Sequence, residues 1–274
     1  MIMQYFVYLK EKTNMKKIAI VLLALLLCCT SVVFAQGQKE TGEQNSYVFA
    51  ANCAWPPLEF VDENGDVVGF EIDLVNEIAK LTGKTITIRN VAWDGIFAGL
   101  ANGAYNAVAS GVSVTEERKP SMDFSTPIMT ITQAIIAPKS VNDLIDVTSL
   151  HGKTVGVQLG TTGHIYFEDY LKANPKANIN VMAYDEIGFG VEDLLNGNLD
   201  CVVTDSVIAS DYVLANANYS GKLHVTGTAS NVGEPIAIAI KKGDAALLKL
   251  VNDSLVTLEK NGTMQSLRTK WNIL

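Results

Sequence analysis

The chain has 274 residues, of which 48% are hydrophobic, and it carries a formal net charge of −8. This composition allows a large core in one or two domains. The negative charge argues against nucleic acid as a partner, because phosphate binding needs a concentrated basic surface. The three histidines are scattered, and no cysteine or histidine cluster has metal-ligand spacing, so we expect no metal and no cofactor.

The first 35 residues have the pattern of an export signal. Lys16 and Lys17 precede the apolar run Ile18–Leu27, and Val33–Ala35 has the small residues that signal peptidase requires. We therefore predict a protein that is exported and cleaved after Ala35, and that works in the periplasm or otherwise outside the cytoplasm.

Two features of this segment leave alternatives open. Met15 fits a translation start, which would make residues 1–14 an upstream extension. Cys28 and Cys29 would allow lipid anchoring in place of simple cleavage, although the residue before Cys28 is not the usual small one. The polar residues 36–46 that follow are typical of a flexible tether.

Strands and helices alternate from Tyr47 onward. The first run has predicted strands at 47–51, 85–88 and 104–109, with helices that begin near residues 69 and 93. The second run has predicted strands at 153–157, 179–183, 200–204 and 222–225, again with helices between them. This order predicts an α/β fold with mostly parallel sheets.

The two runs contain a short internal sequence repeat. Residues 102–111 align with residues 196–205, and each segment reads as a helix end, a turn and a strand with a polar tip. We therefore expect two similar lobes. Ligands bind beyond the carboxyl ends of parallel strands, so the tips at Ser110 and Asp205 are candidate site residues. Asp205 could face a cation, such as an ammonium group, and we expect it to cap the helix that starts at Ser206 whether or not it also binds a ligand.

The segment after the first tip has the composition of a carboxylate receptor. Gly111 permits close backbone approach, and Ser113 offers a hydroxyl. Thr115 is expected to cap a helix, which would place the planar fork of Arg118 about one turn in. The alternative is a surface turn in which Arg118 pairs with a neighbouring glutamate. A second cradle, at 160–163, would offer backbone N–H groups at a helix start.

Five segments occur in the order seen in extracellular solute-binding proteins of amino-acid ABC transporters, family 3 type: Gly69–Leu74, Trp93–Ile96, Ser113–Arg118, Asp123–Ser125 and Val157–Thr162. The chain resembles that family over residues 47–271. The resemblance implies the type II periplasmic-binding fold, in which two lobes are joined by two hinge strands. Lobe 1 would then comprise residues 47–132 and 230–274, and lobe 2 residues 133–229.

The family also implies one amino-acid site between the lobes. Arg118, Ser113 and Gly111 would bind the α-carboxylate, helped by the backbone of Thr162. Asp205 and the backbone of Gly111 would bind the α-ammonium group. The remaining positions would line the side-chain subsite and the walls: Asn52, Trp55, Trp93, Ser110, Gln158 and Thr161.

The implied function is binding of a free amino acid, polar or basic, and its delivery to a membrane permease by a monomeric protein. Two alternatives use the same scaffold. An exported dehydratase-like enzyme would need a general acid, for which Glu59 and Glu168 are the nearest candidates. A ligand-sensing module would use the same lobes without transport.

Overall fold

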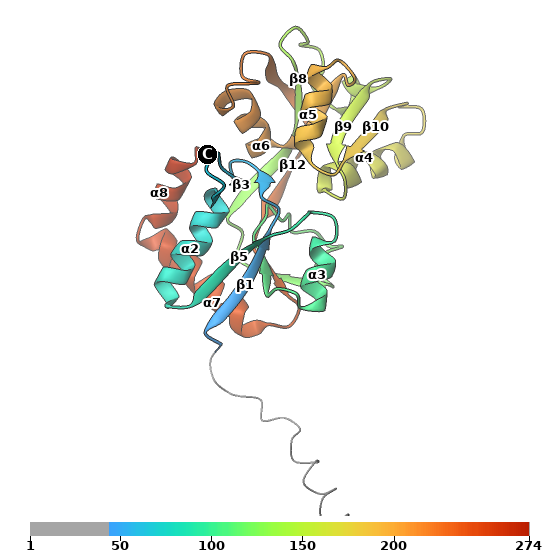
Figure 1. The fold of residues 1–274 in the computed structure, drawn as a ribbon. Coiled ribbons are helices and arrows are strands. Elements are labelled where there is room, and N and C mark those ends of the chain that lie inside the picture. Colours follow the sequence, from blue (N-terminus) through green and yellow to red (C-terminus); the bar gives the residue numbers. More distant parts are fainter. Residues whose placement is uncertain (1–43, 274) are drawn as a thin grey trace, which may run out of the picture. The chain divides into compact units, whose positions relative to one another are not determined.

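The computed structural model describes residues 44–273, so the predicted export signal and most of the tether lie outside the described part. Two five-stranded sheets, each with helices on its faces, make up this part of the chain (Figure 1). A small three-stranded sheet accompanies the first of them. No helix between residues 44 and 273 is long and apolar enough to cross a membrane.

The first sheet has the strand order β5-β1-β6-β13-β7. Its strands are β1 (Ser46–Ala51), β5 (Thr85–Asn90), β6 (Ala107–Val108), β7 (Met122–Phe124) and β13 (Ala239–Lys241). Its helices are α2 (Phe70–Thr82), α3 (Ile96–Asn102), α7 (Ala245–Lys260) and α8 (Thr263–Lys270). The small sheet comprises β2 (Ala54–Trp55), β3 (Glu59–Val61) and β4 (Val67–Val68). Strand β1 thus includes Ser46, the last residue assigned to the tether.

The second sheet has the order β10-β9-β11-β8-β12. Its strands are β8 (Met129–Pro138), β9 (Thr154–Gln158), β10 (Asn180–Tyr184), β11 (Cys201–Asp205) and β12 (Leu223–Ile236). Its helices are α4 (Thr162–Ala173), α5 (Ile187–Leu195) and α6 (Ser206–Ser210), with a 3₁₀ turn η2 (Val147–Leu150) and a π turn η3 (Asp211–Ala215).

The two sheets share one topology, which confirms the two similar lobes. In each, three parallel strands are followed by two antiparallel pairings, so the sheets are mixed rather than mostly parallel. The antiparallel strands β8 and β13 each follow a strand of the other sheet, β7 and β12, and each therefore enters its own sheet from the other lobe.

The internal sequence repeat corresponds to a repeated local structure. Gly103 follows α3 and Gly197 follows α5, and both adopt the left-handed conformation, with φ of 76° and 78°. Glycine takes this conformation without steric cost and so ends each helix. The next strands, β6 and β11, each lie third in their sheets. Their ends bring Ser110 and Asp205 to the carboxyl edges of the two sheets.

Strands β8 and β12 connect the lobes. They pair antiparallel along most of their length and run between the two sheets in Figure 1. Their lower ends also contact the first lobe, since Ile236 pairs with Ser113 and its carbonyl accepts a hydrogen bond from the N–H of Ile128. Irregular pairing interrupts the ladder between Ser230 and Glu234.

Candidate functional site

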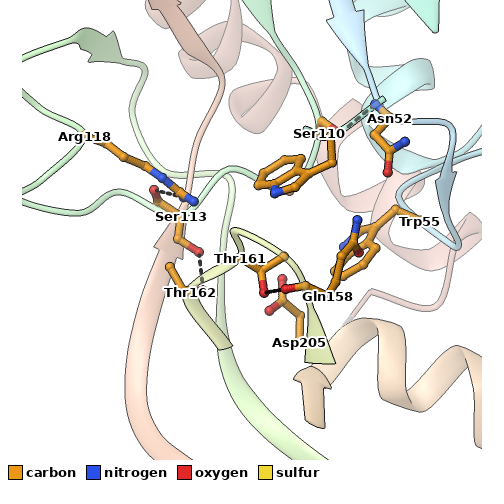
Figure 2. A pocket seen from close by; sticks show the side chains of 11 residues that line it. Asn52, Trp55, Ser110, Ser113, Arg118, Gln158, Thr161, Thr162 and Asp205 are labelled. Carbon is orange, nitrogen blue, oxygen red and sulfur yellow. Dashed lines mark hydrogen bonds between the residues drawn. The ribbon is translucent and has the colours of Figure 1, made fainter. Parts of the chain in front are cut away.

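One pocket brings together all eleven residues that the sequence analysis selected for the amino-acid site. It contains about 320 Å³ of space free of protein atoms, part of which is open to solvent. Its lining comprises Asn52, Trp55, Trp93, Ser110, Gly111, Ser113, Arg118, Gln158, Thr161, Thr162 and Asp205. Arg118, Ser113 and Thr162 lie on one side in Figure 2, while Asn52, Trp55 and Gln158 lie on the other.

Arg118 is presented by a turn, and the predicted helix after Thr115 does not form. Residues 116–121 are turns that lead directly into β7. The Thr115 hydroxyl still accepts a hydrogen bond from the Arg118 backbone N–H (3.2 Å), so it caps the turn instead of a helix. The side chain of Arg118 then reaches the pocket, where its Nη1 donates to the carbonyl of Ser113 at 3.0 Å.

The Arg118 guanidinium retains most of its hydrogen-bonding capacity. Within residues 44–273, one of its five side-chain N–H groups has a protein acceptor, and no carboxylate oxygen lies within 4.0 Å. Burial lowers its pKa, and the negative charges of Asp205, Glu234 and Glu117 act in the opposite direction. Its cationic carbon also lies 4.7 Å from the ring centre of Phe97. A half-buried, charged fork with free donors can take a carboxylate in two parallel bonds.

Asp205 supplies the opposite charge from the second lobe. It is 6% exposed, and its Oδ1 accepts a hydrogen bond from Gln133 Nε2 at 2.9 Å. Burial raises the pKa of this carboxyl to about 7, an effect that the Gln133 hydrogen bond opposes. Asp205 stands at the N-cap position of α6 but makes no side-chain capping bond, so the expectation that it caps this helix is wrong. Its carboxylate is therefore available to the pocket.

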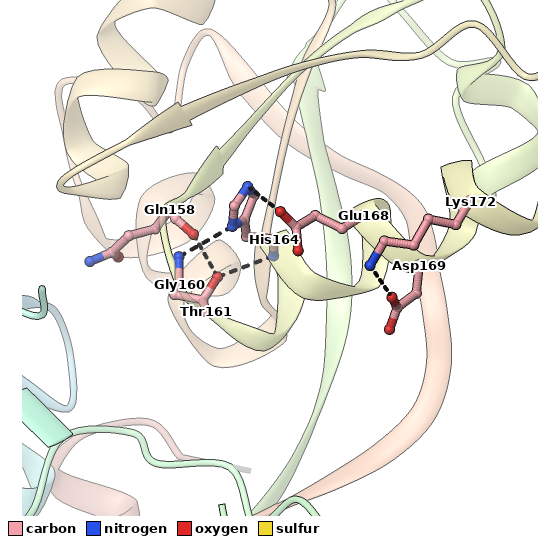
Figure 3. Close-up of polar contacts among 7 residues, drawn as sticks. All are labelled: Gln158, Gly160, Thr161, His164, Glu168, Asp169 and Lys172. Carbon is pink, nitrogen blue, oxygen red and sulfur yellow. Dashed lines mark hydrogen bonds and ion pairs between the residues drawn. The ribbon is translucent and has the colours of Figure 1, made fainter. Parts of the chain in front are cut away.

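The start of α4 forms the cradle predicted at residues 160–163 (Figure 3). Thr161 is the N-cap, and its hydroxyl accepts from the His164 N–H (3.3 Å) while donating to the Gln158 carbonyl (2.8 Å). The Gly160 N–H is used within the turn, because it donates to His164 Nδ1 at 3.3 Å. The N–H groups left for a ligand at this helix start are fewer than the sequence suggests.

The far end of the pocket combines an indole ring with amides. Trp55 and Asn52 are buried at this end, whereas Trp93 lies beside Arg118, whose cationic carbon is 5.8 Å from the Trp93 ring centre, and packs edge-on against Phe97 with ring centres 5.1 Å apart. Gln158 donates through Nε2 to the backbone, but its buried Oε1 has no partner in the described part of the chain. This end therefore offers an aromatic face and a free hydrogen-bond acceptor.

Two buried carboxyls hold the corner at Ser110 and Gly111. Ser110 Oγ accepts from the Asn52 N–H (2.9 Å) and donates to Glu59 Oε1 (2.8 Å). The Gly111 N–H donates to Glu71 Oε1 at 2.9 Å, and Gly111 itself has φ of 56°. The N–H of Gly111 is thus already used within the protein, so it is not free for the α-carboxylate of a ligand.

Sequence reasoning missed Gln133 and Glu234. Gln133 Nε2 lies within 3.3 Å of Thr162 Oγ1, 2.9 Å of Asp205 Oδ1 and 3.0 Å of Glu234 Oε1, so this amide links several parts of the site. The available signal for Gln133 was an amide side chain immediately before the apolar run 134–137 of β8.

The two candidate general acids do not line the pocket. Glu59 is fully buried behind Ser110, and Glu168 is exposed on α4, where it lies 3.9 Å from His164. Among residues 44–273, no cluster of histidine, cysteine, aspartate or glutamate side chains could hold a metal ion.

The sequence model of the bacterial extracellular solute-binding proteins, family 3, matches residues 47–273, and the chain belongs to this family. A probable histidine-binding protein of Neisseria gonorrhoeae is 34% identical over 94% of this chain and 96% of its own length. An L-cystine-binding protein of Escherichia coli is 32% identical over 84% of this chain and 83% of its own. The structure of an ancestral arginine-binding protein bound to arginine superimposes with a TM-score of 0.77, at 36% identity, over 83% of this chain and 98% of that one.

Proposed function

We propose that the protein binds one free amino acid in this pocket and delivers it to the membrane permease of an ABC transporter. The observation that carries the proposal is that Arg118 and Asp205 line the same pocket without forming an ion pair with each other. An amino acid is a zwitterion, and its two charges match these two side chains. The family of the chain and the names of its relatives support the same class of ligand.

The two charges come from different lobes, which links binding to closure. Arg118 follows β6 in the first sheet, and Asp205 ends β11 in the second. A ligand engages both only when the lobes are together, so it shifts the population toward the closed state. In this proposal β8 and β12 are the hinge, lobe 1 comprises residues 47–132 and 230–274, and lobe 2 comprises residues 133–229.

The far end of the pocket favours a polar or basic side chain. The unpartnered Gln158 Oε1 is a buried acceptor. Leaving such an acceptor without a hydrogen bond costs about 1–3 kcal/mol. A ligand side chain with an N–H donor would satisfy it, and the faces of Trp55 and Trp93 would accept a flat or cationic group. Relatives named for histidine and arginine carry such ligands.

We further propose export by the N-terminal segment and cleavage after Ala35, which yields a monomer outside the cytoplasm. Mass spectrometry of the exported protein distinguishes this product from one that carries lipid on Cys28 or Cys29. Size-exclusion chromatography with light scattering tests the monomer.

Isothermal titration calorimetry against the common amino acids and cystine tests the binding proposal. Arg118→Ala should weaken binding of the best ligand by about 2–5 kcal/mol, roughly a 30-fold to several-thousand-fold rise in Kd. The reason is that it removes the cation that would pair with the ligand's α-carboxylate inside the pocket. Arg89→Ala is the matched control, since Arg89 is exposed on β5 and donates to the Ala104 carbonyl away from the pocket. Equal affinities of the Arg118→Ala variant and the wild type would exclude this site.

A further inference from the structure

Glu234 is a charged side chain beside the pocket that the proposed mode of binding does not use. It lies on β12, is half-buried, and is not one of the eleven lining residues. Its Oε2 accepts a hydrogen bond from Ser113 Oγ at 3.0 Å, and its Oε1 accepts from Gln133 Nε2 at 3.0 Å. One carboxylate therefore connects a residue of the Arg118 loop with a residue of β8.

The donors that Glu234 uses are limited in number. The Ser113 hydroxyl has a single hydrogen, which it gives either to Glu234 or to another acceptor. The Gln133 amide has two hydrogens, whereas Asp205, Glu234 and Thr162 all present acceptors within 3.3 Å of it. Glu234 thus takes the one hydrogen that Ser113 would give to the α-carboxylate of a ligand.

The charges around Arg118 also set Glu234 against a ligand carboxylate. Arg118 is the one cationic side chain among the eleven lining residues, and both Asp205 and Glu234 act on its charge. A ligand carboxylate on Arg118 would add a further negative charge near Glu234, whereas the positive charge of the same ligand, its α-ammonium group, would lie at Asp205. Like charges at such short range are mutually destabilising in a partly buried site.

We propose that Glu234 is an internal competitor of the ligand's α-carboxylate, an inference that rests on the proposed amino-acid site. Without ligand, the Glu234 carboxylate holds the Ser113 hydroxyl. On binding, the α-carboxylate takes that hydrogen bond, and Glu234 keeps only its contact with Gln133. The resident carboxylate sets the affinity of the pocket below what its other contacts would give.

The test is calorimetry on Glu234→Gln and Glu234→Ala with three amino acids of different side chains, such as arginine, histidine and glutamine. Removing the competing charge should lower Kd by roughly tenfold. The gain should be the same for each ligand, because every amino acid has the same α-carboxylate. Glu117→Gln is the matched control: its charge also acts on Arg118, but it is exposed and takes no pocket donor.

A double-mutant cycle with Ser113→Ala separates competition from a general change in structure. The gain from Glu234→Gln should shrink in the Ser113→Ala background, because the contested hydrogen is absent there. An undiminished gain, or an unchanged or higher Kd in both Glu234 variants, would overturn the competitor assignment. A higher Kd would instead make Glu234 a ligand of the α-ammonium group. The proposed function fails separately, if Arg118→Ala binds as well as the wild type.

Discussion

Glu71→Gln should change how the stability of the protein depends on pH. Glu71 is fully buried in the first turn of α2, and burial raises the pKa of its carboxyl from 4.5 to about 8, against the effect of its bond from the Gly111 N–H. Glu59 lies close by, and burial together with the charge of Glu71 raises the pKa of Glu59 as well. Neither carboxyl has a cationic partner within 4.0 Å among residues 44–273.

The sign of this pH dependence follows from proton linkage. A carboxyl whose pKa is higher in the folded state contributes stability that is fully present below its unfolded pKa and is lost as the pH rises through its folded pKa. For Glu71 this window runs from pH 4.5 to about 8. One proton corresponds to about 1.4 kcal/mol per pH unit, so the loss across the window is on the order of 3–5 kcal/mol. This is a large share of the stability of a typical domain.

The variant removes the titration while keeping the shape. A glutamine at position 71 retains an oxygen for the Gly111 N–H and has no proton to release in this pH range. Urea unfolding without ligand at pH 5, 6, 7, 8 and 9 measures the free energy of unfolding of both proteins. We expect the free energy of unfolding of the variant, relative to that of the wild type, to rise by about 1.4 kcal/mol per pH unit up to pH 8.

The matched control is Glu77→Gln on the same helix, where the carboxylate pairs with Lys80 at the surface (2.6 Å). This change should leave the pH slope of the wild type in place. If the difference between the Glu71 variant and the wild type stayed constant from pH 5 to 9, the buried carboxyl would not be protonated in the folded state. The account of the Ser110–Gly111 corner would then be wrong.

Two further outcomes are expected. Burial raises the pKa of Asp205 to about 7, and a ligand ammonium group favours the ionised form, so Kd should fall as the pH rises toward 7 and should lose this dependence in Asp205→Asn. Calorimetry at pH 5 to 8 measures it, and an equal slope in the variant would speak against Asp205. Gly69→Ala should destabilise the fold severely, because an added Cβ would lie 2.2 Å from the Leu58 carbonyl oxygen, whereas Gly65→Ala meets open space and should cost only about 1–2 kcal/mol for its positive φ. Similar urea midpoints for the two variants would contradict this packing argument.

Local sequence patterns predicted the features that depend on neighbouring residues. The start of α2 near residue 69 was predicted from local periodicity, and the end of this helix at Gly83, where φ is 67°, is likewise a local property. The prediction of a helix after Thr115 was wrong for a reason that is also local. Lys119 precedes Pro120, which disfavours helical backbone, and β7 begins at Met122, so too few residues remain for a helix.

The remaining site residues depend on tertiary contacts that no local pattern specifies. Glu234 bonds to Ser113, 121 positions away in the sequence, and Gln133 bonds to Asp205 across 72 positions. Glu71 lies in the first turn of a helix, where an acidic residue is expected to be exposed and to favour the helix dipole. It is buried because Leu58 accepts the Glu71 N–H at 2.9 Å and draws β3 against the start of α2.

The distribution of unsatisfied polar atoms marks this pocket independently of any resemblance. Five buried side-chain atoms in the described chain have no hydrogen-bond partner: Glu59 Oε2, Glu71 Oε2, Gln133 Oε1, Gln158 Oε1 and Thr204 Oγ1. Each belongs to a residue that lines the pocket, contacts a lining residue or adjoins one in the sequence. Such groups reduce stability, and random placement would scatter them through both lobes. Among these atoms Gln158 Oε1 alone belongs to a lining residue, so it is the one whose missing hydrogen bond a ligand can supply directly.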